Sequence, residues 1–192
     1  NGVRGSDSPG FNDLLGSAVA RVGDINNDGK DDILVGALGG ELLVDSPALN
    51  RGRAYVVYGS STAGFSNLAT STNGYNLNLL NGNQGIAMSG PEVVNAQFSY
   101  TLSGGGDFDN DAIPDLLGAE QSGGVTSSAY VLYGDGVQFG GLHNISMDQL
   151  EGTHTSGADD VNSDGVDDGA RFGGLDATGY GLAVANAGDV DN

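Results

Sequence analysis

The sequence predicts an all-β protein assembled from repeated four-stranded units, and three observations lead to this prediction. Glycine supplies 35 of the 192 residues without a collagen-like period, which indicates many tight turns. Short alternating stretches of small and apolar residues recur between loops rich in glycine and aspartate, as expected of strands. An aspartate-rich block is written twice and begun a third time, so the chain contains an internal repeat.

Gly-Asp pairs mark the start of each aspartate block. Asp24, Asp107 and Asp189 each follow a glycine and stand 83 and 82 residues apart, a spacing too regular for coincidence. We expect a strand before each block, at 17–22, 98–103 and 182–187. Another strand is expected after each complete block, at 33–37 and 116–119.

A third strand is expected where the chain nearly repeats itself, with AYVVYG at 54–59 and AYVLYG at 129–134. Weaker fourth strands are expected at 86–90 and 170–174, and four strands per repeat are typical of a propeller blade. The sequence therefore predicts β-propeller-type blades of four antiparallel strands, with calcium loops in strand-loop-strand hairpins. The predicted organisation is an N-terminal extension at 1–11, a first blade at 12–95, a second at 96–177 with an Asp-rich insertion at 153–169, and a truncated third repeat at 178–192.

The charge balance narrows the choice of partners. Acidic residues outnumber basic ones by 25 to six, for a formal net charge of −19, which argues against nucleic acid and anionic membrane surfaces as partners. The sequence contains no run of about eighteen apolar residues, so we expect no insertion into a membrane. Of the acidic residues 21 are aspartate, the residue that loops use for cations. With no cysteine, the chain offers neither disulfides nor thiolate metal sites. The absence of an initiator methionine and of an apolar leader before Asn1 predicts a mature form or a fragment.

Each block follows the pattern D-x-[DN]-x-D-[GA]-x-x-D, in which short oxygen-bearing side chains converge on one point. A hard cation that takes roughly six to eight oxygen ligands fits such a loop, which favours Ca²⁺ over Mg²⁺. The candidate ligands are Asp24, Asn26, Asp28, Asp32 and the Lys30 carbonyl in the first loop, and Asp107, Asp109, Asp111, Asp115 and the Ile113 carbonyl in the second. The insertion repeats the spacing at Asp160, Asn162, Asp164, Val166 and Asp168, and Asp189 and Asp191 begin a further loop.

Clustered carboxylates repel one another, so the loops themselves imply a counter-ion. An EF-hand is rejected, because it needs glutamate at the twelfth position, which here holds Val35, Gly118 and Arg171, and helices on either side. The alternative is that the loops are Asx turns on an acidic surface. Gly29 stands at the sharp turn, where a positive φ is expected, and Ala112 replaces it in the second loop at a cost of about 1 kcal/mol.

These motifs resemble the FG-GAP repeats of integrin α-subunit propellers and, in the long period and the YVVYG strand, their bacterial surface-protein relatives. In that family a Phe-Gly pair precedes the first strand, a calcium loop DxDxDGxxD follows it, and Gly-Ala-Pro closes the second strand. The Phe-Gly places here hold Leu15-Gly16, Phe98-Ser99 and Tyr180-Gly181, while Gly36-Ala37 and Gly118-Ala119 are followed by Leu38 and Glu120 instead of proline. The resemblance implies an extracellular β-propeller, secreted or at the cell surface, with calcium as a structural staple and a role in adhesion, assembly or ligand display.

Catalysis finds no supporting motif, since His143 and His154 lie in no catalytic pattern, and we expect no enzymatic activity. The alternative to a structural or adhesive role is a lectin-like or enzyme-accessory module that binds a ligand on its loop face. The expected partner is accordingly a protein, or an extracellular-matrix or carbohydrate ligand.

Two blades and a stub cannot close a propeller, so we expect either a homo-oligomer or a piece of a longer chain. Asp189 to Asn192 of one copy, followed by Asn1 to Gly5 of another, read as D-x-D-x-N-G. One hypothesis is therefore head-to-tail assembly through a shared calcium loop, and the alternative is a longer parent chain.

Overall fold

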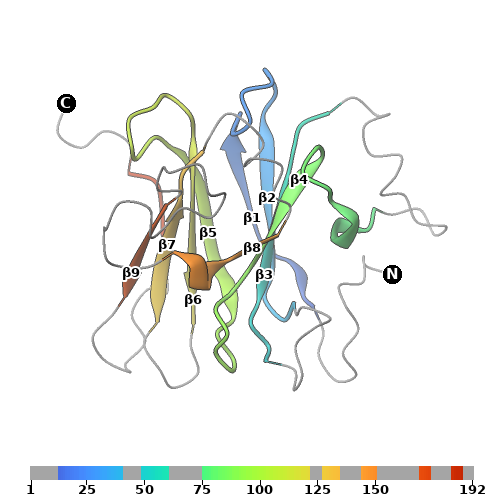
Figure 1. Cartoon of the computed structure of the whole chain (residues 1–192), viewed down its shortest axis with the longest axis vertical. Helices are drawn as coiled ribbons and strands as arrows, with labels where there is room; N and C mark the ends of the chain where they lie inside the picture. Colours follow the sequence, from blue (N-terminus) through green and yellow to red (C-terminus); the bar gives the residue numbers. More distant parts are fainter. Residues whose placement is uncertain are drawn as a thin grey trace.

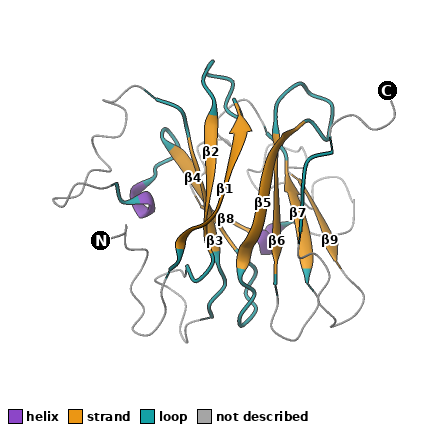
Figure 2. Cartoon of the chain, turned by 180° about the vertical axis from the view of Figure 1, so that it is seen from behind, coloured by secondary structure: helices purple, strands orange, loops and turns teal. Residues whose placement is uncertain are grey.

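The computed structural model describes residues 13–40, 49–60, 75–121, 127–134, 144–150, 169–173 and 183–187. These residues form two β-sheets that stand side by side (Figures 1 and 2). Within them the only helical elements are two short 3-10 turns, η2 (Leu77–Leu79) and η4 (Met147–Gln149). The predicted all-β, blade-like class is confirmed. The strand predicted at 182–187 is wrong, because residues 183–187 form no strand, and the Asn186 N–H donates to the Ser103 hydroxyl at 3.2 Å instead of to a neighbouring strand.

Both sheets contain four strands that follow one another in chain order and pair antiparallel, as in a propeller blade. The first sheet comprises β1 (Leu15–Gly23), β2 (Asp32–Ala37), β3 (Arg53–Val57) and β4 (Gly85–Ser89). The second comprises β5 (Phe98–Gly106), β6 (Asp115–Glu120), β7 (Ser128–Leu132) and β9 (Gly169–Gly173).

The strand registers establish which residues of the two units correspond. Ile33 lies opposite Val57 in the first sheet, and Leu116 lies opposite Leu132 in the second. Each of these pairs joins the residue after the last aspartate of a loop to the third residue of a Tyr-Val-x-Tyr-Gly segment. The aspartate and tyrosine motifs therefore carry the correspondence between the units.

The Gly-Ala pairs do not correspond in the same way. Gly36 lies opposite Ala54, whereas Ala119 lies opposite the equivalent Ala129. The pair Gly118-Ala119 is thus one position out of step with its apparent counterpart. Matching these pairs by sequence is wrong by one residue, because the register is set by the aspartate that begins the strand.

A fifth strand in the first sheet was not expected from the sequence. β8 (Asn144–Ser146) comes from the second unit and pairs with β4 in parallel. A buried arginine reinforces this contact: the Arg51 side chain is 2% exposed and donates from Nε to the Gly90 carbonyl at 2.8 Å and from Nη2 to Ser146 Oγ at 3.1 Å. Arg51 Nη2 also lies 3.4 Å from Asp148 Oδ2, so the second unit is bound to the first by charge as well as by backbone pairing.

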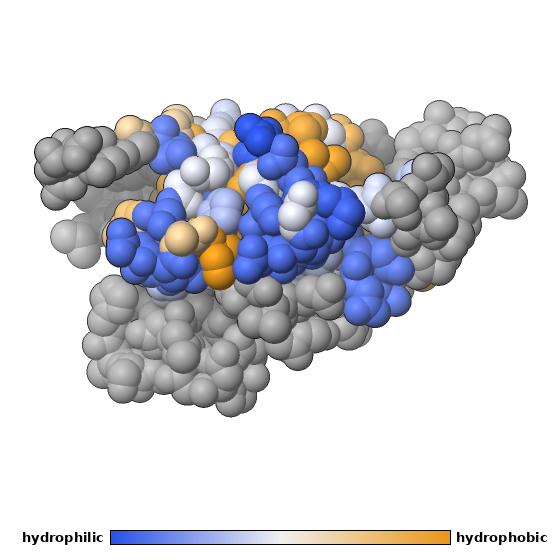
Figure 3. All heavy atoms as spheres, turned by 90° about the horizontal axis from the view of Figure 1, so that it is seen from above, coloured by the Kyte–Doolittle hydropathy of each residue, from blue (hydrophilic) through white to orange (hydrophobic). Residues whose placement is uncertain are grey.

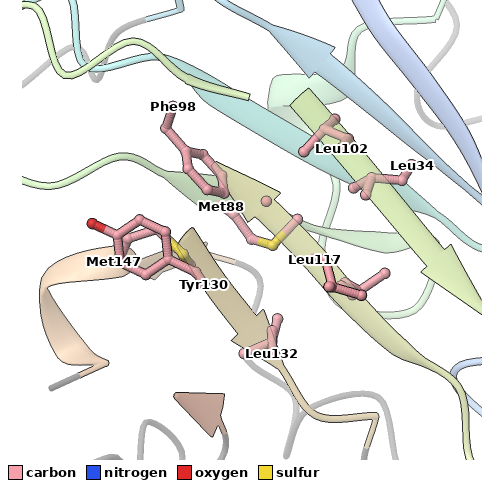
Figure 4. A pocket seen from close by; sticks show the side chains of 10 residues that line it. Leu34, Met88, Phe98, Leu102, Leu117, Tyr130, Leu132 and Met147 are labelled. Carbon is pink, nitrogen blue, oxygen red and sulfur yellow. The ribbon is translucent and has the colours of Figure 1, made fainter. Parts of the chain in front are cut away.

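The larger apolar core fills the space between the sheets. Leu34 and Met88 of the first sheet meet Leu116, Leu132 and Met147 of the second unit, and the residual cavity among them is about 10 Å³ (Figure 4). Side chains alternate across a strand, so Leu34 and Leu116, at different distances from their aspartates, lie on opposite faces of their sheets. The back of one sheet therefore packs on the front of the next, as in successive propeller blades.

The first strands of the two units, β1 and β5, run next to each other at the centre of the molecule (Figures 1 and 2). Glycine permits this approach. A Cβ atom on Gly104 of β5 would overlap the Val22 side chain of β1. The absence of a side chain at Gly104 is thus required by the neighbouring sheet.

This packing predicts the effect of adding one methyl group. Gly104→Ala should lower the free energy of unfolding by about 1–3 kcal/mol, because Val22 must be displaced in a tightly packed core. Val22→Ala also destabilises, but the double variant should lose less than the sum, since the new methyl group occupies part of the vacated space. Strictly additive losses in chemical denaturation would contradict direct contact between the two positions.

Candidate metal centre

The two complete aspartate loops connect equivalent strands and lie at the same end of the molecule. Residues 24–31 join β1 to β2 and residues 107–114 join β5 to β6. Both loops are at the top of Figure 1, and Figure 3 shows that hydrophilic residues dominate the middle of that end. The described residues of both predicted sites are therefore presented on one face.

Side-chain oxygens organise the first loop by accepting hydrogen bonds from its backbone. The Asp28 N–H donates to Asp24 Oδ1 at 2.8 Å, and the Gly29 N–H donates to Asp24 Oδ2 at 2.7 Å. The Lys30 N–H donates to Asp28 Oδ1 at 3.0 Å, and Asn26 Oδ1 accepts from Asp28 at 3.3 Å. These bonds bend the chain around the first aspartate, and each oxygen retains a second lone pair that can face a cation.

The second loop repeats this arrangement bond for bond. Asp107 accepts from the N–H groups of Asp111 and Ala112, both at 3.0 Å, and Asp111 accepts from that of Ile113 at 2.7 Å. Asp109 Oδ1 accepts from Asp111 at 3.3 Å. The shared sequence pattern thus produces the same local geometry in two different surroundings.

The last aspartate of each loop is fully buried and connects three segments of its unit. Asp32 accepts the Ile25 N–H at 3.0 Å through Oδ2 and the Gly59 N–H at 2.7 Å through Oδ1. Asp115 likewise accepts from Phe108 through Oδ2 and from Gly134 through Oδ1 at 2.9 Å. The final glycine of the Tyr-Val-x-Tyr-Gly segment is therefore a structural partner of the loop.

Sequence reasoning assigned Gly59 and Gly134 to a strand and missed this role. A Cβ on Gly59 would lie 2.5 Å from the Asp31 carbonyl oxygen, and one on Gly134 would overlap the Pro114 carbonyl, because the loop backbone passes directly over each glycine. The signal that could have found them is the glycine repeated at the same place in both Tyr-Val-x-Tyr-Gly segments.

Carboxylates gather most closely in the second loop. Oxygens of Asp107, Asp109 and Asp115 all lie within 4.8 Å of one another. Burial raises the pKa of Asp115 to about 6, against the lowering effect of its two backbone hydrogen bonds. Burial, and then the negative charge of Asp111, also raise the pKa of Asp109. Such a group favours a bound positive charge, because the ionised carboxylates are partly desolvated and repel one another.

The first loop has a weaker negative field. Asn26 stands where the second loop has Asp109, and the Lys30 ammonium lies 3.0 Å from Asp28 Oδ2. Burial raises the pKa of Asp32, and the charges of Asp24 and Asp28 add to this rise. The two loops thus share their backbone geometry and differ in charge.

The donor set consists of oxygen atoms alone, which suits a hard divalent cation. The backbone carbonyls of Lys30 and Ile113 were predicted as ligands. The backbone N–H groups of the same two residues donate the hydrogen bonds to Asp28 and Asp111 described above. The other predicted ligands lie outside the described residues: Asp160, Asn162, Asp164, Val166 and Asp168 of the insertion, and Asp189 and Asp191 near the C-terminus. The same holds for the two terminal segments of the shared-loop hypothesis.

Comparison with protein families identifies the first unit. The FG-GAP repeat model matches residues 15–57, which run from the first residue of β1 to the last residue of β3. This segment is an FG-GAP repeat. The second unit reproduces the topology and the loop hydrogen bonds of the FG-GAP segment, although the model match covers the first.

The structure explains the glycine of Leu15-Gly16, which occupies the Phe-Gly place of this repeat. Gly16 has φ +88° at an irregularity between Leu15 and Val19, and the equivalent Ser99 has φ +71°. A left-handed residue there lets β1 and β5 bend without losing their pairing. Serine adopts this conformation only with strain.

A comparison of the chain with curated proteins finds no match. Among the residues that the structure describes, no helix is long and apolar enough to cross a membrane. FG-GAP repeats are structural or ligand-binding modules.

The turn position of the two loops provides a matched pair of substitutions. Gly29 has φ +86° and Ala112 has φ +72°, as the sequence predicted for this position. Ala112→Gly should stabilise the protein by about 1 kcal/mol in chelator, whereas Gly29→Ala should destabilise it by a similar amount. Chemical denaturation measures both, and a Cβ at Gly29 would meet open space, so a change there reports backbone strain alone. Equal signs for the two variants would contradict this account.

Proposed function

We propose that this chain is a calcium-binding β-propeller segment of an extracellular protein, with a structural role in adhesion or assembly. The observation that carries the proposal is the cluster of Asp107, Asp109 and Asp115, whose oxygens lie within 4.8 Å of one another. It occurs at the strand-to-strand turn equivalent to the aspartate loop of the FG-GAP repeat. Geometry, charge and family thus support the same ion.

Each loop would hold one Ca²⁺. The proposed ligands are the side chains of Asp24, Asn26, Asp28 and Asp32 with the Lys30 carbonyl, and those of Asp107, Asp109, Asp111 and Asp115 with the Ile113 carbonyl. The ion would offset the electrostatic cost of the clustered carboxylates, which is largest around buried Asp115. Binding would connect the loop start, the second strand and the end of the third strand, the segments that Asp32 and Asp115 already join.

A ligand-binding role on the loop face is the second candidate, and an aromatic group beside the second loop favours it. Phe108 stacks on Tyr133 with ring centroids 6.3 Å apart and meets Phe172 edge-on at 6.3 Å. Phe108 and Phe172 are exposed. Aromatic faces of this kind stack on sugar rings, so a carbohydrate or matrix ligand is the partner that this alternative would take.

Calcium removal tests the proposal directly. A ligand that binds only the folded state contributes about 2.7 kcal/mol per site at a hundredfold excess over Kd. We therefore expect EDTA to lower the Tm strongly and to open the aspartate loops to protease, with Ca²⁺ restoring both properties and Mg²⁺ doing so poorly. An unchanged melting curve in excess EDTA, on protein verified as metal-free, would refute calcium stabilisation.

Single-ligand variants separate the two sites. Asp28→Ala should abolish binding at the first loop and leave the second intact, and Asp111→Ala should do the reverse, because the loops belong to different sheets. Isothermal titration calorimetry counts the sites. Asn26→Asp is the matched control: it adds the carboxylate that the second loop has at Asp109 and should tighten binding at the first loop. Loss of all calcium binding from either alanine variant would contradict independent sites.

A further inference from the structure

The two units bury unequal parts of equivalent surfaces. Ile33 of the first unit corresponds to Leu116 of the second by strand register. Tyr75 corresponds to Ile145, because each lies two residues before a 3-10 turn. Leu116 and Ile145 are each 2% exposed, whereas Ile33 is 46% and Tyr75 is 43% exposed. The difference arises because the first sheet covers the second unit, while this side of the first sheet faces outwards.

A groove marks the uncovered face. It has a volume of about 340 Å³ and is lined chiefly by Ile33, Val57, Tyr75 and Leu77. Three equivalent residues of the second unit, Leu116, Leu132 and Met147, line the residual cavity of about 10 Å³ shown in Figure 4, where Leu34 and Met88 of the first sheet fill the space. The groove is therefore the same kind of docking site without its occupant. We call this surface the groove face.

The opposite end of the molecule carries the complementary surface. Ile25 and Met88 of the first unit are 0% and 2% exposed in the core between the sheets. Their counterparts in the second unit are Phe108 and Phe172, which are 59% and 52% exposed. With Tyr133, the counterpart of buried Tyr58, they form an exposed cluster that we call the aromatic face. η2, beside the groove face, and β9, which carries Phe172, lie at opposite sides of the molecule (Figure 1).

We infer that the aromatic face of one copy docks on the groove face of a second copy. The same contact already exists within the chain. The surface of the first unit that corresponds to the aromatic face covers the surface of the second unit that corresponds to the groove face, where Met88 packs on the second unit and pairs in register with Ile145. In the contact between copies, Phe172 takes the place of Met88 and Tyr75 the place of Ile145.

The two faces are unlike, so the contact is heterologous and each copy keeps one unused face after it joins a partner. Association therefore continues until a ring closes or a chain of copies forms. Each copy carries a net charge of −19, and repulsion weakens the contact at low ionic strength. The interface is made of apolar side chains and does not itself require a bound ion, although Phe108 of the aromatic face belongs to the second loop.

Two single substitutions test the inference in calcium-containing buffer at physiological salt. Sedimentation velocity and native mass spectrometry of the full chain should detect species larger than 19.3 kDa that increase with concentration. Phe172→Asp, on the aromatic face, and Tyr75→Asp, on the groove face, should each weaken association by at least about tenfold. Val94→Asp is the matched control, since Val94 is 59% exposed and lies on neither face, and it should leave association unchanged.

A mixture of the two variants gives the sharpest result. Each variant retains the face that the other has lost, so an equimolar mixture should form one-to-one dimers that grow no further. Calcium stoichiometry and Tm, measured on the same samples, report whether each variant is folded and whether its calcium sites are intact. If an aspartate variant unfolds, Phe172→Ser or Tyr75→Ser is used in its place.

Wild-type chain that stays monomeric up to about 100 µM, well above the ~1 µM Kd of a modest interface, would overturn the inference while leaving calcium binding untouched. So would a mixture that behaves like its separate components, or a loss of association in Val94→Asp. Monomeric chain whose oligosaccharide binding is lost in Phe172→Asp would assign the aromatic face to carbohydrate instead.

Discussion

A buried carboxylate at the end of each aspartate loop holds the repeat unit together. Asp32 and Asp115 are fully buried, and each accepts one N–H from the start of its own loop and one from the glycine after the third strand. A single side chain thereby connects the loop, the second strand and the end of the third. Burying it is unfavourable without partners, and the two backbone donors offset part of that cost.

The loops built on these aspartates combine identical backbone geometry with different charge. Both use the first aspartate to accept two consecutive N–H groups, yet the second brings three carboxylates together where the first has an amide and a nearby lysine. Backbone shape follows from short acceptor side chains, and cation affinity follows from their number and charge. The two units therefore keep one loop geometry while differing in the charge that the loop presents.

The two sheets depend on each other more than a simple chain of repeats would suggest. β8 of the second unit extends the first sheet, and Arg51 is buried where β8, η4 and the residues after β4 meet. An unpaired guanidinium in that position would be costly, so its bonds to Gly90 and Ser146 and its contact with Asp148 make the joint specific as well as stable. The joint also shows how a following unit closes over a preceding one.

Much of the local structure could be predicted from the sequence. The repeat period placed the strands of the two complete units and both loops, although residues 183–187, predicted as a strand, form none. The turn positions at Gly29 and Ala112 have the positive φ that the motif requires. These features depend on residues within a few positions of one another, so a short pattern contains the information. Only the tertiary structure decided the offset of the Gly-Ala pairs, the addition of β8 and the roles of Gly59 and Gly134. The tertiary structure also decided which face of each sheet is covered. Alternation along a strand specifies two faces, but it does not say which of them a neighbouring sheet will bury, because the covering contacts join segments far apart in the chain.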